Sequence, residues 1–206
     1  MASTKYKLAE ELINIVSGGA QNRDNKITIN QAALFVSQAA NKYIRDFIYQ
    51  SKAMGVQDVP YDVLKSFTVT TKKDVKRNAW YVTLPNRGLS TLIDGLGIYQ
   101  VRFEDEIDNV FIPTSVGFDS IFSRLDAYTL EKNPSYYPER DRIYFRGVSD
   151  VCDISVVMIV DNTTIGNREP LTIPADAEYE VLQMALQLAG LQQQSRADNI
   201  NNDSPS

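Results

Sequence analysis

Apolar residues repeat with a helical period at both ends of this 206-residue chain and with a strand period in its middle. Residues 4–17, 28–54 and 174–191 carry apolar side chains three and four positions apart, which is the spacing of one helix face. From about residue 60 to residue 170 the chain is rich in aromatic and β-branched residues, with turn residues between them. Helical and strand patterns are therefore segregated along the chain, which is typical of an α+β fold.

Local signals mark the ends of the three predicted helices. A pair of glycines at positions 18–19 ends the first helix, because glycine adopts the left-handed geometry of a helix C-terminus. Thr28 and Gln31 match the capping box that opens a helix, so a long second helix should follow. Pro174 suits the first turn of the third helix, and the acidic residues after it complement the positive helix end.

The middle of the chain contains several strand patterns. Residues 66–70 alternate polar and apolar side chains, which predicts a half-buried strand. Residues 154–160 are apolar on both faces and predict a central strand. One short helix is expected around residues 118–125, where apolar residues return to helical spacing. The Gly-Leu-Gly at 95–97 lacks the third glycine of a dinucleotide loop and predicts a turn that enters a strand.

These patterns predict an α+β fold in which an N-terminal helix pair and a C-terminal helix form one helical layer. The middle should be a β-rich antiparallel region. We expect residues 1–58 and 171–191 to build the layer, and residues 59–170 to form the β-rich region with its short helix. Residues 192–206 hold almost no apolar mass, so a disordered or docking tail is expected there.

Composition argues against several classes of function. The chain has no histidine, which removes the commonest general acid–base, the commonest metal ligand and every Ser-His-Asp or Cys-His arrangement. Its single cysteine, Cys152, lies in an apolar stretch, where a small buried hydrophobe is the ordinary role. The net charge is −5, and Lys and Arg look scattered, without the basic stripe of a free-standing nucleic-acid binder. The longest apolar run, 156–160, is too short to span a bilayer.

Carboxylates provide the only case for a catalytic or metal site. Four of them lie close together in the middle of the chain: Glu104, Asp105, Glu106 and Asp108. They lack the ligand spacing and glycine turn of a calcium loop, so we interpret them as a solvated loop or an electrostatic surface. Asp24 with Asp74, or Glu139 with Asp141, could form a catalytic pair only at a set separation that sequence does not show. We therefore predict a protein that is not an enzyme, with no catalytic residue, cofactor or metal.

Several segments occur in an order that resembles one family of virion proteins. They are LAEELINIVSGG near the N-terminus, GLGIYQVRF leading to FIPTS, then ERDRIYFRG, and finally PLTIPADAEYEVLQMAL. In this order, over roughly residues 5–190, the chain resembles the head–tail connector proteins of podovirus-like tailed bacteriophages, especially crAss-like phages. These are neck ring proteins of the adaptor or tail-tubular type, and none of the segments is catalytic.

The resemblance implies a virion structural protein without enzymatic activity. Such proteins form closed homo-oligomeric rings around the DNA channel, expected here to be dodecameric to match the portal. They stack between the portal protein and neighbouring tail or ring proteins, and they enclose DNA without sequence-specific binding. They are made in the host cytoplasm and end in the neck or tail of the virion.

The ring model assigns the predicted helices to contacts between subunits. A ring needs a heterologous interface, in which one face of a subunit meets a different face of its neighbour. We expect lateral contacts from residues 28–54 and 174–191, and the candidate contact residues are Phe35, Tyr43, Phe47, Val181, Met184 and Leu188. The acidic stretch 104–108 would face the lumen or an axial neighbour. The chain's 11 tyrosines suit core filling and interface anchoring equally well.

Two other functions fit parts of the sequence. A soluble non-enzymatic adaptor or regulator, binding a single protein partner, would use the polar tail and the tyrosines. An enzyme with carboxylate chemistry has only the acidic clusters in its support. It would require a concave pocket that encloses two carboxylates with perturbed pKa values.

Overall fold

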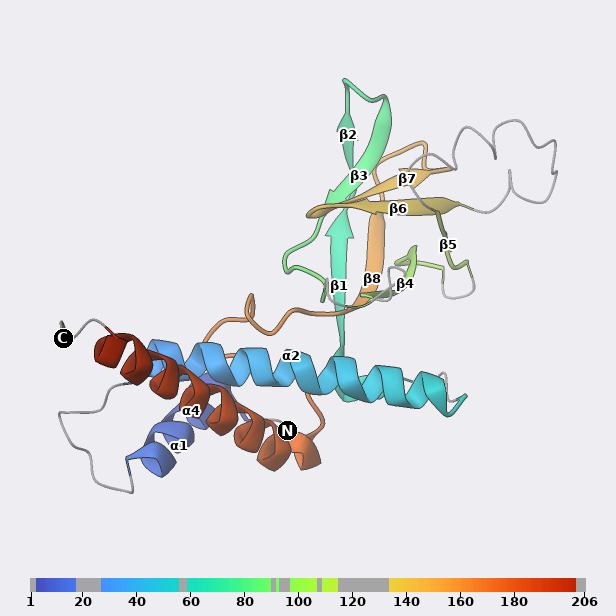
Figure 1. Ribbon diagram of the computed structural model, residues 1–206. Helices are drawn as coiled ribbons and strands as arrows, with labels where there is room; N and C mark the ends of the chain where they lie inside the picture. Colours follow the sequence, from blue (N-terminus) through green and yellow to red (C-terminus); the bar gives the residue numbers. More distant parts are fainter. Residues whose placement is uncertain are drawn as a thin grey trace. The chain divides into compact units, whose positions relative to one another are not determined.

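Helices lie at both ends of the chain and strands lie between them in the computed structural model, which is an α+β fold (Figure 1). The structure describes residues 3–17, 27–55, 59–89, 92, 97–106, 109–114 and 134–202, with side chains to residue 190. The chain divides into a helical unit, Met1–Val63 with Asp161–Ser206, and a β unit, Leu64–Val160. The β unit thus begins later than residue 59 and ends earlier than residue 170. The short helix predicted at 118–125 lies outside the described residues.

Three helices form the helical unit, and both ends of the chain contribute to it. They are α1 (Lys5–Val16), α2 (Ile29–Ala53) and α4 (Glu178–Asn202), with the 3-10 turns η1 (Tyr61–Val63) and η3 (Ala175–Ala177). The long helix α2 packs against both α1 and α4, and α1 also contacts α4 (Figure 1). Four buried alanines on α2 allow this close approach: Ala32, Ala33, Ala39 and Ala40. The predicted helical layer is therefore present, with α2 at its centre.

Side-chain caps start the first two helices. Thr28 and Gln31 form the predicted capping box: the Thr28 backbone N–H donates to Gln31 Oε1 at 2.9 Å, and the Gln31 N–H donates to Thr28 Oγ1 at 3.3 Å. Thr4 caps α1 by accepting from the Lys7 backbone N–H at 3.3 Å. The glycine pair at 18–19 lies outside the described residues. These bonds satisfy N–H groups that a helix start leaves without an intrahelical partner.

A buried hydrogen-bond network holds the returning chain against α2. Asn162 is fully buried, and its backbone N–H donates to Asn41 Oδ1 on α2 at 2.9 Å. The Asn41 Nδ2 group donates to Asp161 Oδ1 at 2.7 Å. Asn162 Oδ1 in turn accepts from the backbone N–H of Thr172 at 3.0 Å and from its hydroxyl at 3.1 Å. Both ends of the segment 161–172 are thereby tied to one point on α2.

The last helix extends beyond the point that the sequence suggests. The backbone of α4 continues to Asn202, whereas the apolar pattern ends near Leu191 and predicts a tail at 192–206. Among the described side chains of α4, the last buried one is Ala189. The core of the helical unit is thus complete before residue 192, and residues 203–206 lie outside the described part.

The smaller sheet of the β unit has the strand order β1-β8-β4 and is fully antiparallel. Its strands are β1 (Leu64–Thr70), β4 (Ile98–Phe103) and β8 (Asp153–Ile159). The central position of β8 confirms the prediction from its apolar faces, and Ile154, Val156 and Met158 are fully buried. The exposure of β1 alternates along the strand, as predicted for a half-buried strand. Gly97 directly precedes β4 and forms the predicted turn into a strand.

The larger sheet has the order β2-β3-β7-β6-β5. Its strands are β2 (Lys72–Asp74), β3 (Ala79–Thr83), β5 (Ile112–Pro113), β6 (Ser135–Glu139) and β7 (Arg142–Arg146). All pairs are antiparallel except β5 with β6, which run parallel over two residues. The middle region is therefore β-rich and antiparallel apart from this one short pair.

Aromatic rings fill the core of the β unit. Phe111 is 1% exposed and makes edge-on contacts with Phe103, at 4.7 Å between ring centroids, and with Phe145, at 5.5 Å. Tyr136 pairs with Phe145 across β6 and β7 and is also buried. Burial raises the pKa of Tyr136 to about 12, because the charged phenolate loses its hydration inside the core.

The buried asparagine predicts a stability effect that a surface asparagine does not share. Asn162→Ala leaves the Thr172 N–H and hydroxyl without their acceptor, so we expect a loss of about 2–4 kcal/mol in the free energy of unfolding. Asn167→Ala, at an exposed position of the same loop, should change it by less than about 0.5 kcal/mol. Denaturant unfolding of both variants measures the difference. Equal effects would contradict the assigned role of Asn162.

The raised pKa of Tyr136 predicts a loss of stability in alkali. Above pH 10 the unfolded chain releases the phenolic proton while the folded chain keeps it, so stability falls as pH rises towards about 12. For a buried group the full effect is on the order of 2–3 kcal/mol. Tyr136→Phe should remove this part of the pH dependence and leave the neutral-pH stability little changed. Unfolding curves of wild type and variant between neutral pH and pH 12 test this, and parallel pH profiles would refute it.

Candidate functional site

The six helix residues predicted to contact other subunits fall into two groups. Phe35 is 7% exposed and Val181 is fully buried, so both fill the core of their own helical unit and are not available to a neighbour. This corrects their assignment as contact residues. The four others are half-buried on α2 and α4: Tyr43, Phe47, Met184 and Leu188. Their role in subunit contact stays a prediction.

Aromatic and acidic side chains lie close to Tyr43 on the helical unit. The Tyr43 ring stacks on Phe47, with 6.3 Å between centroids. Partial burial raises the pKa of Tyr43, and the nearby carboxylates of Glu180 in α4 and Asp176 in η3 raise it further. Tyr179 lies between those two residues in sequence and is 73% exposed. An aromatic, acidic surface therefore lies where α2 meets the start of α4.

The predicted acidic cluster is a solvent-exposed turn where the structure describes it. Glu104, Asp105 and Glu106 follow β4 and are exposed, whereas Asp108 lies outside the described residues. Asn109 donates to Glu106 Oε2 at 2.8 Å, so this carboxylate has a local partner. Among the described residues, no group of three or more Asp, Glu or Cys side chains could hold a metal ion.

The two predicted carboxylate pairs have different outcomes. Asp24 lies outside the described residues, and Asp74 shapes the β2–β3 turn by accepting from the backbone N–H groups of Lys76 and Arg77, at 3.0 and 3.3 Å. Glu139 is the last residue of β6 and Asp141 lies in the β6–β7 turn, but Glu139 forms an ion pair with Arg77. The Arg77 hydrogen bond holds the pKa of Glu139 below its usual value. A carboxylate in that state is an acceptor and a poor general acid.

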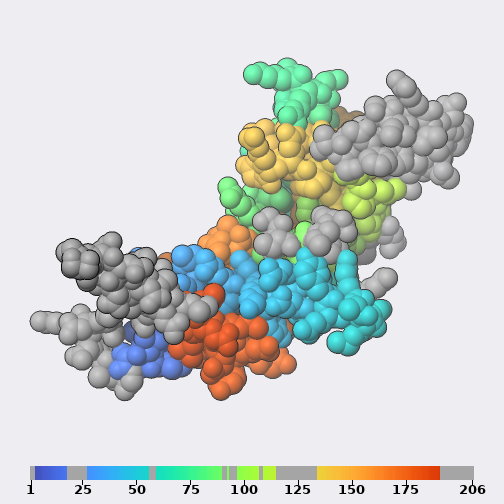
Figure 2. Space-filling view, in the orientation of Figure 1, coloured from blue at the N-terminus to red at the C-terminus, as the bar shows by residue number. Residues whose placement is uncertain are grey.

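Basic side chains gather on one face of the larger sheet, although they are separated in the sequence. Side chains two positions apart on a strand point to the same face. This rule and the strand registers place five residues of β2, β3 and β7 on one face: Lys72, Tyr81, Arg142, Tyr144 and Arg146. In the space-filling view the β2–β3 hairpin, in green, lies against the gold atoms of β6 and β7 (Figure 2). We name this surface, together with Arg77 of the hairpin turn, the cationic face.

A row of three neighbouring tyrosine rings lies on the cationic face. Tyr81, Tyr144 and Tyr137 are direct neighbours across β3, β7 and β6. The ring centroids of Tyr137 and Tyr144 are 5.4 Å apart with nearly parallel planes, and those of Tyr81 and Tyr144 are 5.6 Å apart. Tyr144 is only 3% exposed, and its hydroxyl donates to Asp74 Oδ2 at 3.4 Å. The row is thus a rigid platform, fixed by strand pairing and ring contact.

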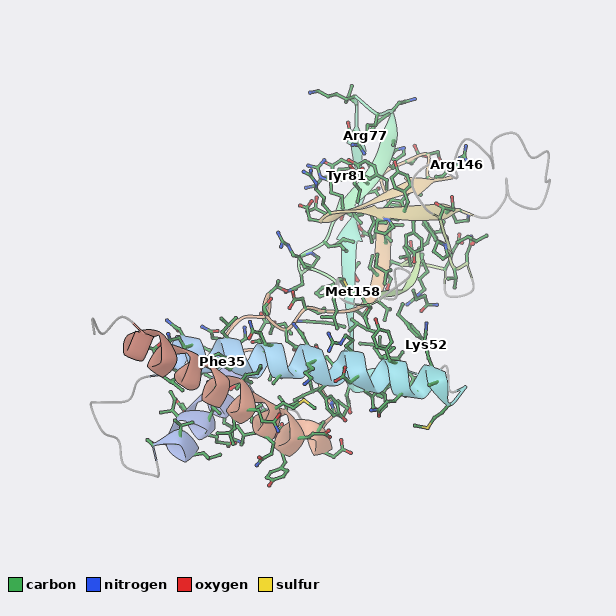
Figure 3. All side chains as sticks on the ribbon, in the orientation of Figure 1. Phe35, Lys52, Arg77, Tyr81, Arg146 and Met158 are labelled. Carbon is green, nitrogen blue, oxygen red and sulfur yellow. The ribbon has the colours of Figure 1, made fainter. Side chains whose placement is uncertain are left out.

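Two guanidinium groups lie on this platform. The Arg77 Cζ atom is 4.8 Å from the Tyr144 ring centroid, and the Arg142 Cζ atom is 4.6 Å from that of Tyr81. Arg77 also forms a two-pronged ion pair with Glu139. Stacking on a ring face holds a planar guanidinium while its N–H edge stays available to an acceptor. Arg146 stands at the end of β7, away from the hairpin (Figure 3).

The arrangement suits contact with an anionic partner. Its cations are fixed in position on a sheet, so little conformational freedom is lost when an acceptor binds. Sequence inspection missed this face because its members come from separate strands. One signal was present in KKDVKR at 72–77 and in Arg142, Tyr144 and Arg146, which alternate at strand spacing.

A scan against protein-family models finds no match to this chain, and a search of curated proteins finds no significant match. None of the described helices is long and apolar enough to cross a membrane.

The tyrosine platform predicts a clear difference between two substitutions of one residue. Tyr144→Ala removes a buried ring that contacts two other rings, so we expect a loss of about 3–5 kcal/mol in stability. Tyr144→Phe keeps the ring and loses the hydroxyl contacts with Asp74 and Arg142, which should cost less than the loss of the ring, about 1 kcal/mol. Thermal unfolding of the two variants provides the measurement. Similar losses would mean that the hydroxyl, and not the ring, holds the platform.

Proposed function

We propose that this protein is a bacteriophage virion structural protein that forms a head–tail connector ring around the DNA channel. The ring stacks between the portal protein and neighbouring tail or ring proteins, as a homo-oligomer that is dodecameric to match the portal. It encloses DNA without reading its sequence. The chain is made in the host cytoplasm, joins the neck or tail of the virion and acts without catalysis.

The observation that carries this proposal is the aromatic surface that remains on the helical unit after its own core has formed. Tyr43 and Phe47 are half-buried and stacked, and Tyr179 is 73% exposed. Tyrosine is enriched in protein interfaces, because it combines a large apolar ring with a polar tip. An accessible cluster of such rings favours a role that depends on contact with other protein chains.

A ring requires two different surfaces on each subunit, because each copy meets a different face of the next copy. The chain carries two surfaces of unlike chemistry. One is the aromatic, acidic surface around Tyr43 and Tyr179 on the helical unit, and the other is the cationic face of the larger sheet. Such a difference is compatible with head-to-tail assembly.

The segments that carry the family resemblance correspond to elements of the fold. LAEELINIV lies in α1, GIYQVRF covers the turn and strand of β4, and ERDRIYFRG covers the β6–β7 turn and β7. PADAEYEVLQMAL begins at η3 and continues into α4. The resemblance therefore extends over packed elements of both units.

An adaptor that binds one protein partner would use the same aromatic surface. The two functions differ in symmetry, because an adaptor needs one binding surface and a ring needs two. Recovery of a host protein, without the portal, by the tagged chain from infected cells would favour the adaptor.

Deletion of residues 192–206 tests the connector directly. The last buried side chain described on α4 is Ala189, so the truncated chain should fold and melt within a few degrees of the wild type. We expect its incorporation into virions to fall, because the deleted segment is proposed to dock on a neighbouring ring. Quantitative mass spectrometry of purified virions, with the wild-type chain as the reference, measures the incorporation.

Two results would contradict the proposal at different levels. Wild-type incorporation of the truncated chain would refute the docking role of residues 192–206. Absence of the full-length chain from purified virions would refute the connector itself.

A further inference from the structure

The β2–β3 hairpin ends in a turn that extends beyond β6 and β7 of the same sheet (Figure 1). We name residues 72–78 the hairpin tip. Asp74 Oδ1 accepts from the backbone N–H groups of Lys76 and Arg77, at 3.0 and 3.3 Å, and Asn78 takes a left-handed conformation with φ of 48°. The tip is therefore held in one shape before any partner binds, so little conformational freedom is lost on binding.

The hairpin tip presents one apolar side chain among lysines. Val75 is 84% exposed. Lys72, Lys73 and Lys76 are also exposed, and none of them forms an ion pair with a residue that the structure describes. Lys73 lies over the Trp80 ring, a contact that leaves the charge of the ammonium group in place. The tip thus combines an apolar contact with ammonium groups that a partner can reach.

The hairpin tip stays cationic after its ion pair is taken into account. Residues 72–78 contain four Lys or Arg and one Asp, which gives a charge of +3. The ion pair of Arg77 with Glu139 offsets one of these charges and leaves +2. Residues 174–190, at the start of α4, contain three Asp or Glu and no Lys or Arg, which gives −3. Two segments of the same chain therefore carry opposite charge.

The aromatic, acidic surface has the chemistry that complements the hairpin tip. Asp176 and Glu180 are exposed. Partial burial raises the pKa of Tyr43 and these two carboxylates raise it further, so their negative potential reaches the Tyr43 ring. Tyr179 is 73% exposed, and Met184, one helical turn after Glu180, is half-buried. Because interfaces combine an apolar centre rich in tyrosine and methionine with a polar rim, this surface suits contact with a cationic, partly apolar partner.

We propose that the hairpin tip of one copy docks on the aromatic, acidic surface of the next copy in the ring. The proposal rests on the proposed function and names the two surfaces that meet in its head-to-tail contact. Val75 contacts the Tyr179 ring at the centre, and Lys72 and Lys76 pair with the carboxylates at the rim. The tip and the helix surface are different parts of the chain, as a heterologous interface requires. Opposite charges on the two surfaces steer the encounter and fix its register.

Nucleic acid is the alternative partner for the lysines of the tip. Phosphates would pair with the ammonium groups, but a phosphate backbone offers no apolar surface to Val75. A single exposed apolar residue is ordinary on a protein surface. The combination of Val75 with the lysines, and a matching surface in the same chain, therefore favours a second copy. The following experiment separates the two partners.

The test reverses the charge on each side of the contact and measures self-association of the purified full-length chain by sedimentation velocity. Lys72→Glu with Lys76→Glu should weaken association roughly tenfold at low salt, and so should Asp176→Lys with Glu180→Lys. The chain with all four substitutions should associate within about threefold of the wild type, because opposite charges face each other again. All four positions are exposed, so circular dichroism should show folded variants. Lys72→Gln with Lys76→Gln, which removes charge without reversing it, should give a smaller loss.

The matched control is Lys52→Glu with Arg168→Glu, which makes the same change of charge at exposed positions of the helical unit. It should associate like the wild type, and weakening equal to that of the hairpin variant overturns the docking. So does a failure of the chain with all four substitutions to recover, because the lysines would then serve another partner, such as nucleic acid. A wild-type chain that stays monomeric at millimolar concentration also overturns it. Presence of that chain in purified virions would still leave the connector standing without this contact.

Discussion

The helical unit depends on one buried polar contact between α2 and the chain that returns from the β unit. Asn162 is fully buried, yet its backbone N–H and both polar groups of its side chain have partners: Asn41 on one side and Thr172 on the other. A satisfied polar network in a low-dielectric core specifies one arrangement, because any shift leaves groups unpaired. The Asn162 network therefore fixes the position on α2 at which the second segment of the helical unit, residues 161–206, begins.

Much of the architecture follows from periodicity and capping. The capping box at Thr28, the central strand at 154–160 and the half-buried strand at 66–70 are all confirmed. Each of these features is local, because its signal lies within a few adjacent residues. The end of α4 is different, since Gln- and Asn-rich sequence has no apolar stripe but still continues the helix to Asn202. The boundaries of the two units also depend on which distant residues pack together, so they lie outside the reach of local patterns.

The candidate site is non-local, which is why sequence inspection found only fragments of it. Lys72 and Tyr81 meet across a hairpin, but Tyr81 and Tyr144 meet only when β3 pairs with β7 in one register. A shift of one residue would turn Arg142, Tyr144 and Arg146 to the opposite face. Phe35 and Val181 show the converse difficulty. An apolar stripe does not say whether its partner lies in the same chain, and here the partner does.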